Sequence, residues 1–241
     1  MKMRLLLPSL LWLASAAAVA AQPACRQALA MGLDISGSVD AQEYRQQLDG
    51  LAGALLHPDV RQALLAMPGA PVRIAVYEWS GAPDQRVILP WTEIDSAETL
   101  NAAVARLRAI GRQPASRTTG LGAAMLAGAA LLGQQAGCPK RTLDISGDGT
   151  SNSGPRPREI RHDPALNGIV INGLVIGGWG AEGTPARRAE LARLAAYFRA
   201  EVIRGPGAFV ETAHGYADYE AAMVRKLLRE LEGMNLSRLD Q

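Results

Sequence analysis

The sequence Leu-Asp-Ile-Ser-Gly occurs twice, at residues 33–37 and 143–147, and both copies carry groups that can bind a metal ion. The first copy extends to an Asp-x-Ser-x-Ser pattern, and the second leads into another aspartate. One carboxylate with several neutral hydroxyls suits a hard divalent ion such as Mg²⁺, which prefers oxygen ligands and retains waters. Such an ion keeps its affinity for a further carboxylate from a partner. The ligand candidates are Asp34, Ser36, Ser38 and Asp148. A simpler reading of the first copy is a strand end followed by helix caps.

A third segment adds hydroxyl groups. Arg-Thr-Thr-Gly at residues 117–120 precedes an apolar helical pattern, so it presents hydroxyls at the start of a helix. Ser116, Thr118 and Thr119 lie close together in the sequence, and the sequence leaves open which of them is the ligand.

Short apolar runs alternate with longer helical patterns along the chain. Strands are expected at residues 28–34, 72–79, 86–91, 142–146, 169–176 and 208–212. The first helix is expected to begin with a capping box of Asp40 and Glu43, and a second one with Asp95 and Glu98. Further helices are expected at 122–132, 186–198 and from Tyr219 to about Leu231. This order predicts one α/β domain: a doubly wound, mostly parallel central sheet with helices on both faces.

One strand of the sheet is expected to be antiparallel and to lie at an edge. The short turn at residues 81–84 joins two strands as a hairpin, and an edge strand tolerates Pro90. Both copies of the repeated pentapeptide close a buried strand. Because the carboxyl ends of parallel strands face the ligand-binding side of open α/β sheets, the candidate ligands are expected to converge there.

The composition excludes several classes of protein. The 241 residues include 25 basic and 23 acidic ones, and Lys2 and Arg4 lie in a segment that is expected to be removed, which leaves 23 against 23. No basic field remains to bind nucleic acid or an anionic membrane by charge alone. A coiled coil and a polytopic membrane protein are excluded as well.

Residues 1–21 have the features of a secretory signal peptide: a short basic start, an apolar run and small residues at the end. The alternative is a permanent membrane anchor, which Pro8 and the small-residue stretch disfavour. Cys25 and Cys138 are the two cysteines of the chain, and they fit a single disulfide in an oxidising compartment. Two unpaired buried thiols are the alternative. We therefore expect a periplasmic or secreted protein without stable membrane insertion after signal cleavage.

Together, the segments DISGS, TTGLGAAM and DISGDGTSN resemble the metal-ion-dependent adhesion site (MIDAS) of von Willebrand factor type A (VWA) domains. The resemblance places Asp34, Ser36 and Ser38 in the family's first motif, Thr119 in its second and Asp148 in its third. Motifs such as Glu-Trp-Ser at 78–80 and Pro-Trp-Thr at 90–92 are similar to those of a bacterial branch of unknown function within the superfamily. The similarity covers residues 25–231, which implies a VWA-like domain at 25–233 and a tail at 234–241.

The resemblance implies a protein-binding module of the adhesion type, holding Mg²⁺, or Mn²⁺ or Ca²⁺, and recognising an acidic side chain of a partner protein. In the family's fold the strands that follow Cys25 and Cys138 are neighbours, so it also implies a disulfide at the sheet end opposite the metal. Trp179 follows a strand on the ligand side, where it is either a partner contact or a cover of the core.

Two other functions compete with this interpretation. One is a metal-dependent hydrolase using Asp34 or Ser36 as nucleophile, and the other is a structural domain without a ligand. We expect no enzyme, because His57, His162 and His214 lie in turns or polar segments, and neither Ser36 nor Ser146 has the flanking glycines of a nucleophile elbow. Metal binding separates the metal-dependent binding module from the structural alternative.

Overall fold

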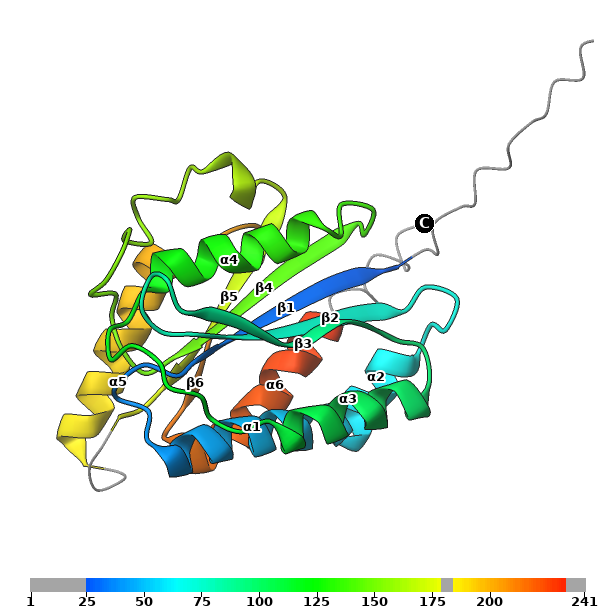
Figure 1. Ribbon diagram of the computed structural model, residues 1–241, viewed down its shortest axis with the longest axis horizontal. Coiled ribbons are helices and arrows are strands. Elements are labelled where there is room, and N and C mark those ends of the chain that lie inside the picture. The colour runs from blue at the N-terminus through cyan, green and yellow to red at the C-terminus, as the bar shows by residue number, and fades with distance from the viewer. Residues whose placement is uncertain (1–24, 179–183, 233–241) are drawn as a thin grey trace, which may run out of the picture.

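The central sheet has six strands in the order β3-β2-β1-β4-β5-β6 (Figure 1). The computed structural model describes residues 25–178 and 184–232. Every neighbouring pair of strands is parallel except β2 and β3, so the predicted fold class is confirmed. The strands are β1 (Gln27–Asp34), β2 (Val72–Trp79), β3 (Gln85–Ile94), β4 (Lys140–Gly147), β5 (Ile169–Ile176) and β6 (Val210–Ala213).

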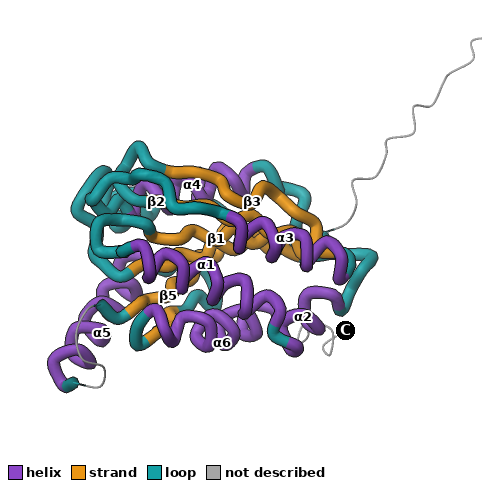
Figure 2. Tube along the Cα trace, turned by 60° about the horizontal axis from the view of Figure 1, so that its bottom comes forward, coloured by secondary structure: helices purple, strands orange, loops and turns teal. Residues whose placement is uncertain are grey.

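Helices cover both faces of the sheet. The helices are α1 (Ala41–Leu56), α2 (Pro58–Leu65), α3 (Ala97–Ala109), α4 (Leu121–Gly133), α5 (Pro185–Tyr197) and α6 (Tyr219–Glu232), with short turns η1 (Pro164–Leu166), η2 (Phe198–Val202) and η3 (Tyr216–Asp218). On one face α1 packs between α3 and α6 (Figure 2). On the other face, α4 lies over β1 and β4. Each face buries a separate apolar cluster, including Leu29, Leu48, Val76 and Met223 on the α1 side and Trp79, Leu121, Ile145 and Phe198 on the α4 side.

Several predicted boundaries differ from the structure, among them the start of β4, which lies at Lys140 rather than at residue 142. The hairpin strand β3 is longer than expected, because its backbone pairs with β2 from Val72–Ile94 to Trp79–Gln85 and the pairing includes polar residues such as Gln85 and Glu93. Helix α3 is capped by Ser96, whose side chain accepts from the Thr99 N–H, and not by Asp95. Strand β6 starts at residue 210 because residues 205–208 form a turn. The capping box of α1 is confirmed, and Pro90 lies exposed on the edge strand.

The aspartate of the second pentapeptide copy, Asp144, does not lie at the carboxyl edge of the sheet. Strand β4 continues to Gly147, so Asp144 lies inside the strand and under α6. There it forms an ion pair with the buried Lys226, whose Nζ is 2.7 Å from Glu230 Oε1. The Asn172 amide donates to the same Glu230 oxygen at 2.6 Å. These four residues form a buried ion cluster that fastens α6 to β4 and β5.

The charges within the buried ion cluster follow from its two acids and one base. Burial and the neighbouring Glu230 charge raise the pKa of Asp144 well above its usual range. Burial also opposes ionisation of Glu230, but the Lys226 ammonium holds the pKa of Glu230 below its usual value. The two acids therefore compete for one cation: Glu230 keeps its charge beside Lys226 more readily than Asp144 does.

The expected disulfide joins Cys25 and Cys138, whose Cα atoms are 5.3 Å apart. The two cysteines precede the neighbouring strands β1 and β4, so the bond lies at the sheet end opposite the carboxyl ends of these strands (Figure 1). No helix within residues 25–178 and 184–232 is both long and apolar enough to cross a membrane. The predicted signal peptide (1–21), the tail (234–241) and Trp179 lie outside the described residues.

Candidate metal site

The candidate site lies at the carboxyl ends of β1 and β4. Strand β1 pairs with β2 on one side and with β4 on the other, so the order of the strands reverses between β1 and β4. Open α/β sheets bind ligands in the crevice at such a switch point. The chain reaches the crevice through three segments: residues 34–40 after β1, residues 116–120 before α4, and residues 147–152 after β4.

Asp34 is fully buried, and among the candidate ligands Ser36 is buried to the same degree. Its Oδ1 accepts the Ser36 N–H at 2.8 Å, which folds the chain after the strand back towards the carboxylate. Its Oδ2 is buried and has no hydrogen-bond partner among residues 25–178 and 184–232. A β-carbon built at Gly147 would lie 3.3 Å from this oxygen, so the glycine leaves room beside it. A buried carboxylate oxygen without a donor is costly unless a cation or a proton binds it.

Ser36, Ser38 and Asp148 form a chain of contacts across the crevice. The Oγ atoms of Ser36 and Ser38 are 3.3 Å apart, and Ser38 Oγ donates to Asp148 Oδ1 at 2.7 Å. The other oxygen of Asp148 accepts from the Tyr216 hydroxyl at 3.4 Å. The structure thus brings together the first and third predicted motifs, although 110 positions separate Ser38 from Asp148.

Of the three hydroxyl residues in the segment before α4, Thr119 is the one whose side chain lies at the crevice. A β-carbon built at Gly149 would lie 3.8 Å from Thr119 Oγ1, which places this hydroxyl against the loop after β4. The main chain of Thr119 is tied to the same loop, because its N–H donates to Asn152 Oδ1 and its carbonyl accepts the Asn152 N–H, both at 2.8 Å. Ser116 and Thr118 instead hydrogen-bond to each other at 2.8 Å and lie beside Gly81.

The electrostatics of the crevice favour a cation. Burial and then the negative charge of Asp148 raise the pKa of Asp34 to about 7. Burial also raises the pKa of Asp148, while the Ser38 and Tyr216 hydroxyls partly offset the effect. Within the described parts of the chain, no three His, Cys, Asp or Glu side chains are grouped to hold a metal. The donor set is therefore two carboxylates with hydroxyls, and an oxygen-seeking ion that keeps part of its water shell fits it.

Three positioning residues were missed by the sequence reasoning. The buried Gln47 of α1 donates to the Asp34 carbonyl at 2.9 Å, and Arg112 donates to the Val39 carbonyl at 2.7 Å. Together they fix both ends of the loop that carries Ser36 and Ser38. Gln47 lies next to the apolar stripe of α1, and a polar residue at that position could have indicated a buried hydrogen bond. Arg112 and Tyr216 gave no signal, because both reach the site from distant segments.

The fold and this crevice define the class of the protein: it has the fold of von Willebrand factor type A domains. A von Willebrand factor type A protein from Catenulispora acidiphila superposes with a TM-score of 0.55 at 14% identity, covering 86% of this chain and 43% of that one. The chain itself belongs to the family described as "Protein of unknown function (DUF1194)", whose sequence model matches residues 24–235. No curated protein matches the chain in sequence.

Two further solved structures share the fold. Proximal thread matrix protein 1 from the mussel byssus, solved with a zinc-occupied MIDAS motif, has a TM-score of 0.56 at 15% identity and covers 87% of this chain. The pilus adhesin SpaC from Lactobacillus rhamnosus GG has a TM-score of 0.56 at 12% identity and covers 88%. The match spans only 48% and 31% of those two chains. At these identities the likeness concerns the fold.

Proposed function

We propose that this protein is a metal-dependent protein-binding module of the adhesion type. Asp34, Ser36, Ser38 and Thr119 hold one divalent ion, and Asp148 binds it directly or through water. Mg²⁺ is the first choice, with Mn²⁺ and Ca²⁺ as alternatives. The observation that carries the proposal is Asp34 Oδ2, a buried carboxylate oxygen without a donor in a crevice lined with hydroxyls.

The ion supplies an electrophilic centre that can accept a carboxylate from a partner protein. The chain's own residues would leave such a position open, because the five side chains supply at most five oxygens when each binds through one atom, whereas octahedral Mg²⁺ takes about six. An Asp or Glu of the partner therefore completes the coordination. A zinc-occupied MIDAS in one structural neighbour and the adhesin role of another support this choice.

We also propose that the protein acts outside the cytoplasm, in the periplasm or as a secreted protein. The Cys25–Cys138 bond supports this location, because such bonds persist in oxidising compartments. The signal-like sequence of residues 1–21 agrees with it.

We propose binding rather than catalysis. Of the three histidines, His57 lies in the turn between α1 and α2, and His162 and His214 are exposed. His214 follows β6 at the same edge as the site, where its carbonyl accepts from Arg187 at 2.9 Å. A hydrolase that uses Asp34 or Ser36 as nucleophile would be served by a histidine base beside it, and within the described residues none of the three imidazoles hydrogen-bonds to Asp34 or Ser36.

Calorimetric titration with Mg²⁺ and Mn²⁺ tests the metal site. We expect one ion per chain for the wild type and for the control Ser151→Ala, whose hydroxyl donates to the Thr119 carbonyl at 3.4 Å. Asp34→Ala should abolish binding. Equal affinities for wild type and Asp34→Ala would overturn the proposal. Capture of exported proteins with Mg²⁺, repeated with chelator, then tests whether the ion bridges to a partner, and a complex that survives excess chelator would exclude the bridge.

A further inference from the structure

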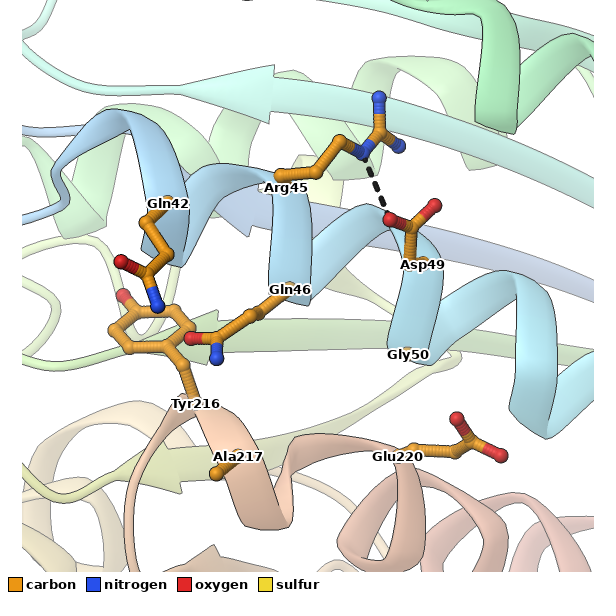
Figure 3. A pocket seen from close by; sticks show the side chains of 8 residues that line it. All are labelled: Gln42, Arg45, Gln46, Asp49, Gly50, Tyr216, Ala217 and Glu220. Atoms are coloured by element: carbon orange, nitrogen blue, oxygen red, sulfur yellow. Dashed lines mark hydrogen bonds and ion pairs between the residues drawn. The ribbon is translucent and has the colours of Figure 1, made fainter.

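A groove of about 440 Å³ runs between α1 and α6 on the surface of the protein (Figure 3). The two helices come close because α1 carries glycines where it meets α6. A β-carbon at Gly50 would lie 2.9 Å from the Tyr219 ring, and one at Gly53 would lie 2.5 Å from the Glu220 carboxylate. The groove is lined by Gln42, Arg45, Gln46, Asp49, Gly50, Tyr216, Ala217 and Glu220.

One end of the groove adjoins the candidate metal site. Tyr216 lines the groove with its ring, next to Gln42 and Gln46 of α1 (Figure 3). The hydroxyl of the same residue donates to Asp148, a candidate metal ligand. The Tyr216 ring is thus the wall between the metal crevice and the groove. A chain that places an acidic side chain on the ion can therefore continue into the groove.

The groove offers polar groups that the protein itself does not use. Within the described residues, the side chains of Gln42, Gln46 and Glu220 have no hydrogen-bond or ion-pair partner, whereas Asp49 pairs with Arg45 at 3.1 Å. The Asp49–Arg45 pair is neutral, so Glu220 leaves one uncompensated negative charge at the far end. The two amides can hydrogen-bond to the backbone of a bound peptide. The Glu220 carboxylate beyond them can pair with a basic side chain of the same peptide.

The spacing between the metal site and Glu220 follows from the geometry of α1. The Glu220 carboxylate lies at Gly53, twelve positions after Ala41, the first residue of the helix. At 1.5 Å per residue this is about 18 Å along the helix axis. An extended peptide advances about 3.3 Å per residue, so it covers that distance in about five or six residues.

We propose that the groove binds an extended segment of the partner protein that carries an acidic residue and, about five or six positions away, a lysine or arginine. The acidic residue binds the ion, the backbone between them hydrogen-bonds to Gln42 and Gln46, and the basic side chain pairs with Glu220. This inference rests on the proposed function, because it assigns the sequence pattern that the same metal site recognises.

Selection from a library of random twelve-residue peptides displayed on phage tests the pattern. Panning is done on the wild type with Mg²⁺, and bound phage are eluted with chelator. The peptides recovered should share an acid and a base at the stated spacing. Synthetic copies are then titrated against the wild type, Glu220→Lys and Glu98→Lys. Glu98 is a matched control, because it is also an exposed acid in the first turn of a helix but lies at the start of α3, by the opposite sheet end.

We expect Glu220→Lys to weaken peptide binding about fivefold to tenfold and Glu98→Lys to leave it unchanged, with Mg²⁺ affinity the same in all three proteins. Glu220→Gln, which cannot upset the helix packing by charge, should weaken binding about two- to fivefold. Replacing the basic residue of the peptide by alanine should remove the difference between wild type and Glu220→Lys.

The outcomes separate the two proposals. Metal-dependent peptides that carry an acid but no base at this spacing, or equal binding to wild type and Glu220→Lys, would overturn the groove proposal and leave the metal bridge intact. Recovery of no chelator-eluted peptide would overturn the groove proposal too. Absence of Mg²⁺ binding in the titration would overturn the proposed function itself.

Discussion

The two copies of Leu-Asp-Ile-Ser-Gly occupy different places in the same sheet. In the first, Asp34 is the last residue of β1 and turns a free oxygen into the crevice. In the second, Asp144 lies three residues before the end of β4, under α6, and pairs with Lys226. The same five residues thus give a candidate metal ligand in one strand and part of a structural ion cluster in the other.

A difference of three residues in register explains the divergence. Asp144 pairs with Met31 in the sheet, and Gly147 lies beside Asp34. Because side chains alternate between the faces of a sheet, a shift by an odd number of residues also exchanges the faces. Asp144 therefore points to α6, whereas Asp34 lies on the α4 side near Trp79 and Phe198. A short motif acquires its role from its position in the register.

The largest effect is expected at the buried ion cluster. Lys226→Met leaves Glu230 as a buried charge without its cation, which costs about 3–5 kcal/mol of unfolding free energy. Urea unfolding followed by circular dichroism measures the loss. The double variant Lys226→Met/Glu230→Gln removes the orphaned charge and should regain most of the stability. A single variant as stable as the wild type would show that the cluster has no structural role.

A pH effect of intermediate size is expected at Asp34. Its folded pKa of about 7 is above the ordinary value of 3.8, so its contribution to the stability of the metal-free protein is fully present below pH 3.8 and is lost as the pH rises to about 7. Metal binding needs the carboxylate, so Mg²⁺ affinity should fall about tenfold per pH unit below 7 and level off above it.

Titrations with Mg²⁺ between pH 5.5 and 8, with thermal unfolding of the metal-free protein at each pH, check this expectation. In the metal-free Asp34→Asn variant, the unfolding free energy should no longer show the pH dependence that the Asp34 carboxyl contributes to the wild type. A flat affinity across the pH range would contradict the burial argument.

The smallest effect is expected for Asp144→Asn. Burial and the Glu230 charge raise the pKa of Asp144 and so favour its neutral form, whose shape asparagine copies, so unfolding free energy should change by less than about 1 kcal/mol. Mg²⁺ affinity should be unchanged, in contrast to Asp34→Asn. Calorimetry and urea unfolding of both variants give the comparison directly, and loss of metal binding in Asp144→Asn would mean that the copies are not distinct in role.

Much of the fold could be predicted from the sequence, because β2 and β5 are apolar runs bounded by turn residues and matched the prediction to the residue. The ends of β3 and β6 could not, since pairing partners and a distant turn set them. Within the site, motif spacing indicated Asp34 and Asp148. The choice of Thr119 over its neighbours, and the contributions of Gln47 and Arg112, depend on contacts between segments that the sequence pattern does not reveal.

The Cys25–Cys138 bond has a mechanical consequence. The candidate site draws its carboxylates from β1 and the end of β4, and the bond couples the opposite ends of the same two strands. A pull between a bound partner and residue 25 acts along both strands and loads their ladder of hydrogen bonds in shear, so that many bonds must break together. The covalent link shares the load between the strands, and the sheet resists being drawn apart one strand at a time.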